Sequence, residues 1–171
     1  MSDMYEKVTD DQDPITKLIG KIPGFKGYIE SSTRRAADAL LRETITLEYG
    51  QLHKRVTNLQ QEMASNGELE YLDELESAAT QLQTFIDKVD GAARGYSGFF
   101  DAVKVDQDAL AKIYEYDVML LESAAGISSA IDNVEQSIGS DGMPAAVRHL
   151  VTMSRDVVAA FEQRSEAIKT L

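Results

Sequence analysis

The chain has 171 residues, with 17 Lys and Arg against 29 Asp and Glu, and a formal net charge of −12. It contains no Cys, which excludes disulfides, thiol nucleophiles and Cys-ligated metal sites. The excess of acid argues against nucleic-acid binding by the whole protein, because such proteins carry a basic surface. No uncharged stretch approaches the length of about 18 residues that a spanning helix needs, and the acidic N-terminus lacks the apolar core of a secretory signal. We therefore expect one cytoplasmic domain, soluble or attached to a membrane surface.

Charge divides the chain into three parts. Residues 1–13 hold five acidic residues and one Lys, which is typical of a solvated tail. Residues 14–35 reverse the sign, with five Lys and Arg against one Glu. The remaining residues are acidic again and carry a net charge of −12. We expect an acidic tail at 1–13, a basic arm at 14–31 and a helical bundle at 32–171.

From residue 32 onward, apolar residues recur at alternating intervals of three and four, the heptad pattern of packed helices. This pattern predicts helices at about 33–65, 68–92, 106–138 and 143–170. The first helix should end at Asn66-Gly67, because these residues tolerate the left-handed conformation that follows a helix. Its stripe consists of Ile45, Tyr49, Leu52, Val56, Leu59 and Met63.

The third predicted helix has the most regular stripe, and the fourth begins at Pro144, which suits a first helical turn. Helices of about 33 residues are nearly 50 Å long at 1.5 Å per residue. The predicted fold class is therefore all-α, an elongated antiparallel four-helix bundle of coiled-coil type with an N-terminal arm or short amphipathic helix. The two stripes are Leu110, Ile113, Asp117, Leu120, Ala124, Ile127, Ile131, Val134 and Ile138 in the third helix, and Val147, Val151, Ser154, Val158, Phe161, Ser165 and Ile168 in the fourth.

Motifs for catalysis and metal binding are missing or incomplete. Neither His53 nor His149 has a Glu three residues earlier, as a di-iron bundle requires. The chain has no nucleophile elbow and no glycine-rich phosphate loop. The acidic run at 106–108 lacks the Gly and the closing Glu of a calcium loop. We expect no catalytic residues, no metal site and no cofactor, and hence a protein that is not an enzyme.

Asp117 interrupts the apolar stripe of the third helix and is the main candidate for a buried polar site. A carboxylate at this position needs a hydrogen-bond donor, or its pKa rises through desolvation. A Tyr hydroxyl or an Arg on a facing helix would serve as the donor. The residue either fixes helix register or belongs to a ligand site with Tyr114 and Ser128. A cavity beside Asp117 would favour a ligand site, and a packed core would favour the structural role.

A run of small residues, 123–130, surrounds Gly126 in the middle of the same helix. Gly in a helix costs about 1 kcal/mol relative to Ala, so a compensating contact is expected. Close approach of a neighbouring helix explains the run best. A small ligand cavity and a face for self-association are the alternatives.

The basic arm is the strongest functional lead. Its apolar residues share one helical face and lysines flank them, so the arm could dock on its own bundle, on a second copy or partner, or on an anionic membrane. We predict a non-enzymatic interaction or scaffold protein, a homo-oligomer or the partner of another helical protein. The alternative is a small-molecule sensor or an enzyme with its site around Asp117, and nucleic acid is not expected as a partner. The predicted interaction residues are Ile15, Lys17, Leu18, Ile19, Lys21, Ile22, Phe25, Lys26 and Tyr28.

The segment Ile22-Pro-Gly-Phe-Lys-Gly-Tyr28, with the basic start of the first long helix, resembles a group of small, uncharacterised bacterial helical proteins. Those proteins begin with a similar I-P-G-[YF]-[RK]-G-Y segment. The resemblance covers about 25 residues and implies no particular activity. An amphipathic segment before long helical hairpins is also similar to the phage-shock-protein-A and ESCRT-III architecture, at the level of the fold. The further matching residues are Arg34, Arg35, Ala36, Asp38, Leu40, Leu41 and Arg42.

Overall fold

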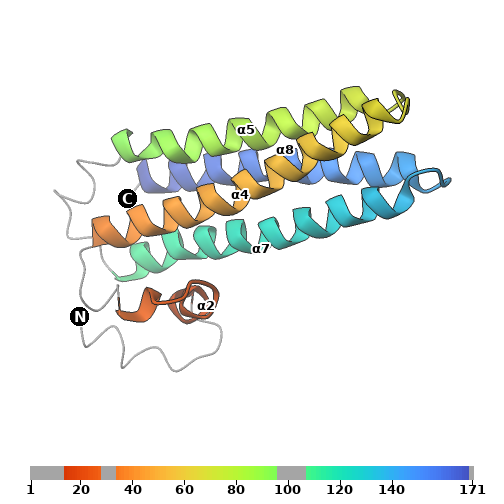
Figure 1. Cartoon of the computed structure of the whole chain (residues 1–171). Helices are drawn as coiled ribbons and strands as arrows, with labels where there is room; N and C mark the ends of the chain where they lie inside the picture. The colour runs from red at the N-terminus through yellow and green to blue at the C-terminus, as the bar shows by residue number, and fades with distance from the viewer. Residues whose placement is uncertain (1–13, 28–33, 96–106, 170–171) are drawn as a thin grey trace.

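The computed structural model describes residues 14–27, 34–95 and 107–169. Within these ranges every long element is a helix and no strand occurs, so the predicted all-α class is confirmed (Figure 1). The acidic tail and Tyr28 lie outside the described residues. The helices are α2 (Pro14–Lys21), α4 (Arg34–Ser65), α5 (Leu72–Gly95), α7 (Gln107–Ser137) and α8 (Met143–Lys169).

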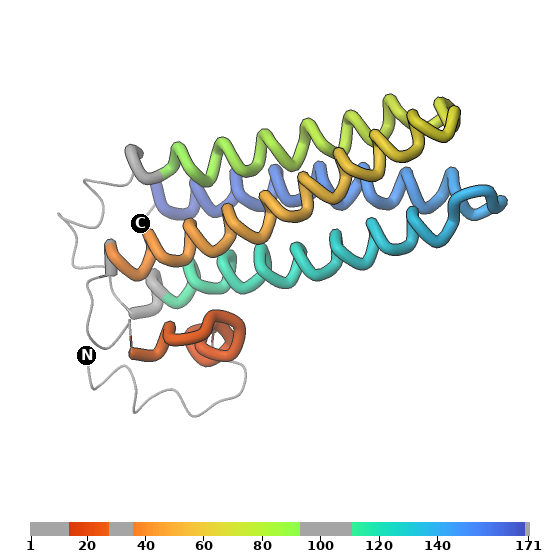
Figure 2. Tube along the Cα trace, viewed as in Figure 1, coloured from red at the N-terminus to blue at the C-terminus, as the bar shows by residue number. Residues whose placement is uncertain are grey.

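The four long helices form an elongated bundle in which each helix has two main neighbours. α4 packs against α5 and α7, while α8 also packs against α5 and α7. Because the chain runs up and down along the bundle, the neighbours α4 and α7 are parallel, and so are α5 and α8 (Figure 2). The consecutive helices α5 and α7 thus lie across the bundle from each other. None of the described helices is long and apolar enough to span a membrane.

The heptad stripes predicted for α4 and α7 form the core. All six predicted positions of α4 are buried, as are the predicted positions of α7 from Ile113 to Val134. The prediction for α8 was partly wrong, because Val151, Val158 and Ser165 are only half-buried. Leu150, Val157 and Arg164 are buried in their place, whereas the predicted Val147, Ser154, Phe161 and Ile168 are buried as expected. A pattern of apolar residues alone would not place an Arg in a core, so it selected Ser165 in place of Arg164.

Two glycine turns close the end of the bundle opposite α2. The amide of Glu68 donates to the carbonyl of Met63 at 2.9 Å, and the amide of Gly67 donates to that of Ala64 at 3.1 Å. This pair of bonds is the Schellman motif, and Gly67 adopts the left-handed conformation it requires, with φ of 77°. The predicted stop at Asn66-Gly67 is confirmed. Gly139, also at φ of 77°, ends α7 beside it.

The arm packs against the chain's own bundle, which was one of the three docking alternatives. Ile15, Leu18, Ile22 and Phe25 are buried in the same hydrophobic cluster as the bundle core, and Ile19 is half-buried against it. α2 lies along the outside of α7 near the starts of α4 and α7 (Figure 1). It therefore adds a second layer to one end of the four-helix body.

Candidate functional site

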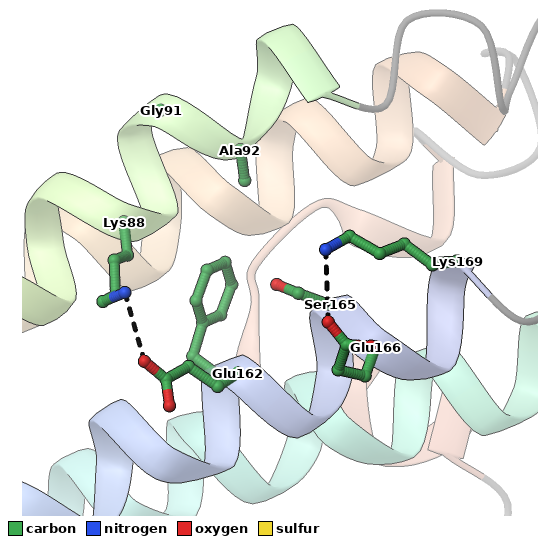
Figure 3. A pocket seen from close by; sticks show the side chains of 8 residues that line it. Lys88, Gly91, Ala92, Glu162, Ser165, Glu166 and Lys169 are labelled. Atoms are coloured by element: carbon green, nitrogen blue, oxygen red, sulfur yellow. Dashed lines mark hydrogen bonds and ion pairs between the residues drawn. The ribbon is translucent and has the colours of Figure 1, made fainter.

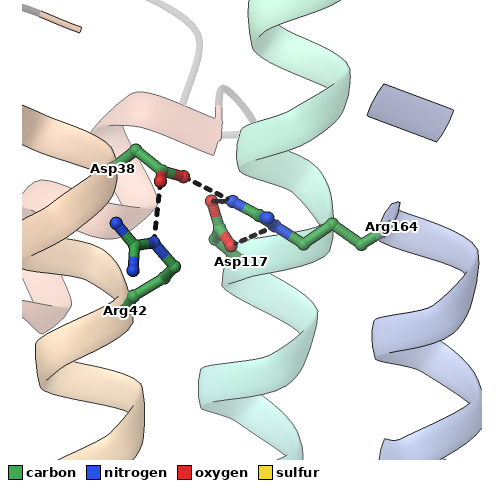
Figure 4. A network of polar contacts seen from close by, with 4 residues as sticks. All are labelled: Asp38, Arg42, Asp117 and Arg164. Carbon is green, nitrogen blue, oxygen red and sulfur yellow. Dashed lines mark hydrogen bonds and ion pairs between the residues drawn. The ribbon is translucent and has the colours of Figure 1, made fainter. Parts of the chain in front are cut away.

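Four charged side chains meet inside the bundle at the end that carries α2 (Figure 4). Arg164 of α8 is fully buried, and its Nε donates to Oδ1 of Asp117 at 2.8 Å. Its Nη2 donates to Oδ1 of Asp38 at 2.7 Å and to Oδ2 of Asp117 at 3.4 Å. Nε of Arg42 donates to the second oxygen of Asp38 at 2.9 Å. The network links α4, α7 and α8 through the centre of the bundle.

Burial governs the electrostatics of this network. Desolvation raises the pKa of Asp117 to about 6, although the positive charge and hydrogen bonds of Arg164 oppose the shift. The nearby Asp38 carboxylate raises this pKa further. Desolvation acts to lower the pKa of Arg164, but the two carboxylates outweigh it and raise that pKa above its ordinary value. Arg164 therefore stays charged, and burial makes the Asp117 carboxylate easier to protonate than an exposed one.

The network has the geometry of a structural link. Asp117 is 1 % exposed, and both of its carboxylate oxygens accept hydrogen bonds from Arg164. The predicted donor from a facing helix is therefore present, and it occupies the carboxylate that a ligand would need. This packing supports the structural role of Asp117 over a ligand site. Sliding α8 along α4 and α7 would separate Arg164 from its two carboxylates and leave buried charges without partners, which is costly. The network therefore also fixes the position of α8 along the bundle.

Asp38 and Arg164 were missing from the predicted site. The sequence contained a signal for both, since each keeps heptad spacing with neighbouring apolar residues. Asp38 lies three residues before Leu41, and Arg164 lies three after Phe161 and four before Ile168. Charged residues of opposite sign at stripe positions of different helices predict a buried pair. Asp117 was identified because it interrupts an apolar stripe, but the same test was not applied to Asp38 and Arg164.

The three residues proposed for a site around Asp117 do not form one site. Tyr114 is buried. Ser128 is eleven residues from Asp117 on the same helix, about 16 Å along the axis. The hydroxyl of Ser128 accepts a hydrogen bond from Nη1 of Arg55 at 2.8 Å, and the same Arg binds Asp132 at 2.6 Å. Ser128 thus belongs to a link between α4 and α7.

The run of small residues on α7 faces α8 on one side and a surface groove on the other. On one side, a Cβ added at Gly126 would lie 2.7 Å from Cε of Met153 on α8, so the end of a flexible side chain from the neighbouring helix fills the space beside this glycine. On the other side, the run forms a wall of a groove of about 370 Å³ between α4 and α7. Lys21, the last residue of α2, marks the end of this groove. The remaining lining residues are Glu48, Gln51, Leu52, Leu121, Ala124, Ala125 and Ser128.

The predicted interaction residues of the arm separate into two sets. The apolar side chains point into the core, while Lys17, Lys21 and Lys26 are exposed. Lys21 lies close enough to Glu48 of α4 to affect it. Burial raises the pKa of Glu48, and the charge of Lys21 partly offsets this rise. The docked arm thus presents a basic surface, and its apolar face becomes available only when α2 leaves the bundle.

A second groove, of about 660 Å³, lies between the C-terminal halves of α5 and α8 (Figure 3). Phe161 and Ala92 supply apolar surface, and the charged side chains along its edge pair with each other. Lys88 binds Glu162 at 3.1 Å, and Lys169 binds Glu166 at 3.1 Å. Both pairs are exposed, and each balances one positive with one negative charge at the edge of the groove. Among the described residues, no group of acidic or histidine side chains is arranged to hold a metal ion.

Comparison of the chain with protein-family models, curated proteins and solved structures gives no match. The resemblance of residues 22–28 to small bacterial helical proteins stays a prediction.

Proposed function

We propose that this protein is a non-enzymatic interaction module that binds a second copy of itself through its N-terminal arm. The observation that carries the proposal is the division of α2 into a buried apolar face and an exposed basic face. Leu18 and Phe25 are fully buried, while the lysines of the arm are exposed. The arm therefore has an apolar face that can bind another surface and a charged face that stays in water. The six residues 28–33 join the arm to the bundle.

The length of α2 supports a reversible arm. An isolated helix of eight residues is not stable in water, so α2 depends on the surface that covers its apolar side. Docking and helix formation are consequently coupled, and the docked arm is among the least stable parts of the fold. An element of this kind can leave its site while the four long helices stay packed.

The sealed polar network supports a role without catalysis. A catalytic carboxylate must reach its substrate, whereas Asp117 is buried and bound to Arg164. The buried charged network of the core is therefore better explained by a structural role, in which it holds the helices together. Cytoplasmic location, with or without attachment at a membrane surface, is part of the same proposal.

The test compares a substitution in the arm with a matched substitution on an exposed face. Leu18→Asp places a charge in the buried face of α2, and Leu47→Asp places the same charge on α4 at a side chain that is 64 % exposed. We expect light scattering to show concentration-dependent dimers for the unaltered protein and for Leu47→Asp, and monomers for Leu18→Asp. Circular dichroism should show that both variants keep the four long helices.

The proposal fails if the unaltered protein is a monomer at every concentration, or if Leu18→Asp associates as well as Leu47→Asp does. Flotation with phosphatidylserine-containing vesicles distinguishes the membrane alternative. Arm-dependent vesicle binding by a monomeric protein would replace the protein partner with a lipid surface.

A further inference from the structure

Two apolar stripes run along α7 near the arm. The core stripe includes Ile113 and Leu120, and a second stripe consists of Tyr114, Val118 and Leu121, all of them at most 5 % exposed. Successive residues of a helix are about 100° apart, so the second stripe points away from the core stripe by roughly that angle. We call Tyr114, Val118 and Leu121 the arm-facing stripe.

α2 covers the arm-facing stripe. The buried apolar residues of the arm belong to the same hydrophobic cluster as the stripe. Among the described helices, α2 makes its main contacts with α7, and Lys21 at its end lines a groove together with Leu121. Because α2 forms a layer outside the four-helix body (Figure 2), its departure would leave this side of α7 in water.

Asp117 lies between the two stripes. It follows Tyr114 by three residues and precedes Leu121 by four, and it has the same spacings to Leu120 and Ile113 on the core side. Residues three and four apart share a helix face. The core therefore lies on one side of Asp117, and the arm-facing stripe with its cover, α2, lies on the other.

The strength of the charged network depends on its enclosure. The side chains of Arg164, Asp117 and Asp38 are 0 %, 1 % and 5 % exposed, and Arg42, at 15 %, is the most exposed of the four. Opposite charges attract each other far more strongly in a protein interior than in water, and an ion pair that water reaches contributes little. The attachment of Arg164 to α7 therefore depends on the element that excludes water from Asp117.

From these observations we propose that docking of the arm and attachment of α8 are coupled. Docked α2 keeps water away from Asp117, and release of α2 weakens the ion pairs that hold the C-terminal half of α8. A partner that captured the arm would thereby alter α8, a helix that is not among the main neighbours of α2. The coupling acts within one chain, and it does not depend on whether the released arm binds a second copy.

Coupling of this kind is reciprocal. Without Arg164, Asp117 would be a carboxylate with no cation beside it in the core, and such a group favours contact with water. Loss of Arg164 should therefore favour release of the arm. Conversely, once the arm has left, water can solvate Asp117, and loss of Arg164 should cost less.

A double-mutant cycle in the full chain tests this coupling. In the unaltered protein and in a Leu47→Asp background, Arg164→Met should lower the urea concentration at half unfolding by the same amount, because Leu47 is 64 % exposed. In a Leu18→Asp background, which releases the arm, the loss should be about half as large or less. Water already reaches Asp117 in that background.

Hydrogen exchange of the single variants gives a second measurement that does not require the doubly altered protein to fold. In Leu18→Asp, the amides of residues 157–169 should exchange about tenfold faster than in Leu47→Asp, while those of residues 143–150 at the turn end should be unchanged. Equal losses in the two backgrounds, or equal exchange at 157–169, would overturn the coupling. Faster exchange along the whole of α8 would overturn it too, since it would indicate general destabilisation.

Discussion

The two ends of the bundle solve the same problem, holding helix ends together, by opposite means. At the turn end, Gly67 and Gly139 reverse the chain within a few residues, and backbone hydrogen bonds cap the helices locally. At the arm end, Asp38, Asp117 and Arg164 join three helices through contacts between residues far apart in the sequence. Local chemistry therefore determines one end, and only assembly of the whole bundle produces the other.

The placement of charge differs in the same way. Between Arg55 and Lys88, around the first turn, the chain has seven acidic residues and no Lys or Arg. Of these carboxylates, Glu76 and Asp87 accept hydrogen bonds from glutamine side chains, and none is enclosed in the core. At the arm end, ionised groups are enclosed in the core, where an unpaired charge is costly. The comparison shows that charge at the turn end contributes mainly solubility, whereas charge at the arm end determines packing.

Removing Arg164 should give the largest effect. Arg164→Met keeps much of the side-chain volume but leaves Asp117 without its hydrogen-bond donor inside the core. We expect the free energy of unfolding to fall by about 3–5 kcal/mol, the cost of breaking a buried pair from one side. Urea unfolding followed by circular dichroism measures this loss.

The matched control is Lys88→Met, which breaks the exposed pair with Glu162 between α5 and α8. Exposed pairs contribute less than about 1 kcal/mol, so this variant should unfold close to the unaltered protein. Equal losses in Arg164→Met and Lys88→Met would contradict the distinction between buried and exposed charge.

The pH dependence of stability should come next in size. Burial raises the pKa of Asp117 from its ordinary value of 3.8 to about 6 in the folded protein. Between these values the folded state binds more protons than the unfolded state, so the free energy of unfolding falls as pH rises from about 4 to about 6. A shift of about two units corresponds to about 3 kcal/mol at most.

Asp117→Asn isolates this contribution, because its amide oxygen can still accept from Arg164 and does not ionise. The difference in stability between the unaltered protein and the variant should decrease from pH 4 to pH 6 in urea titrations. A difference that grows with pH over this window would mean that Arg164 lowers the pKa of Asp117.

One substitution made at two glycines gives the smallest effects, with opposite signs. Gly67→Ala forces a side chain into the left-handed conformation and should destabilise the turn end by about 1–2 kcal/mol. Gly50→Ala lies within α4, where an added Cβ meets nothing within 4 Å, and should stabilise the protein by up to about 1 kcal/mol. Thermal unfolding measures both, and a loss at Gly50 as large as that at Gly67 would contradict the assignment.

Part of this structure could be read from the sequence, and particular residues show where that reading failed. Asn66-Gly67 and Pro144 marked helix ends correctly, since caps depend on neighbouring residues. Part of the α8 face was misjudged because Ser165 was preferred to the charged Arg164 as a core residue. A donor for Asp117 was expected from a Tyr or from an Arg on a facing helix, but which residue supplies it could not be predicted, because residues on different helices have no fixed spacing in the sequence.

The sequence by itself determined the helices, most of their inward faces, the turn end and the amphipathic character of the arm. These properties follow from the periodicity of one chain segment and the conformational preferences of its residues. Tertiary structure alone decided that α4 neighbours α7, that α2 packs against α7, and that Arg164 is shared by Asp38 and Asp117. Those outcomes depend on which surfaces meet, because a buried charge is tolerated only where the partner that compensates it is brought within hydrogen-bond distance.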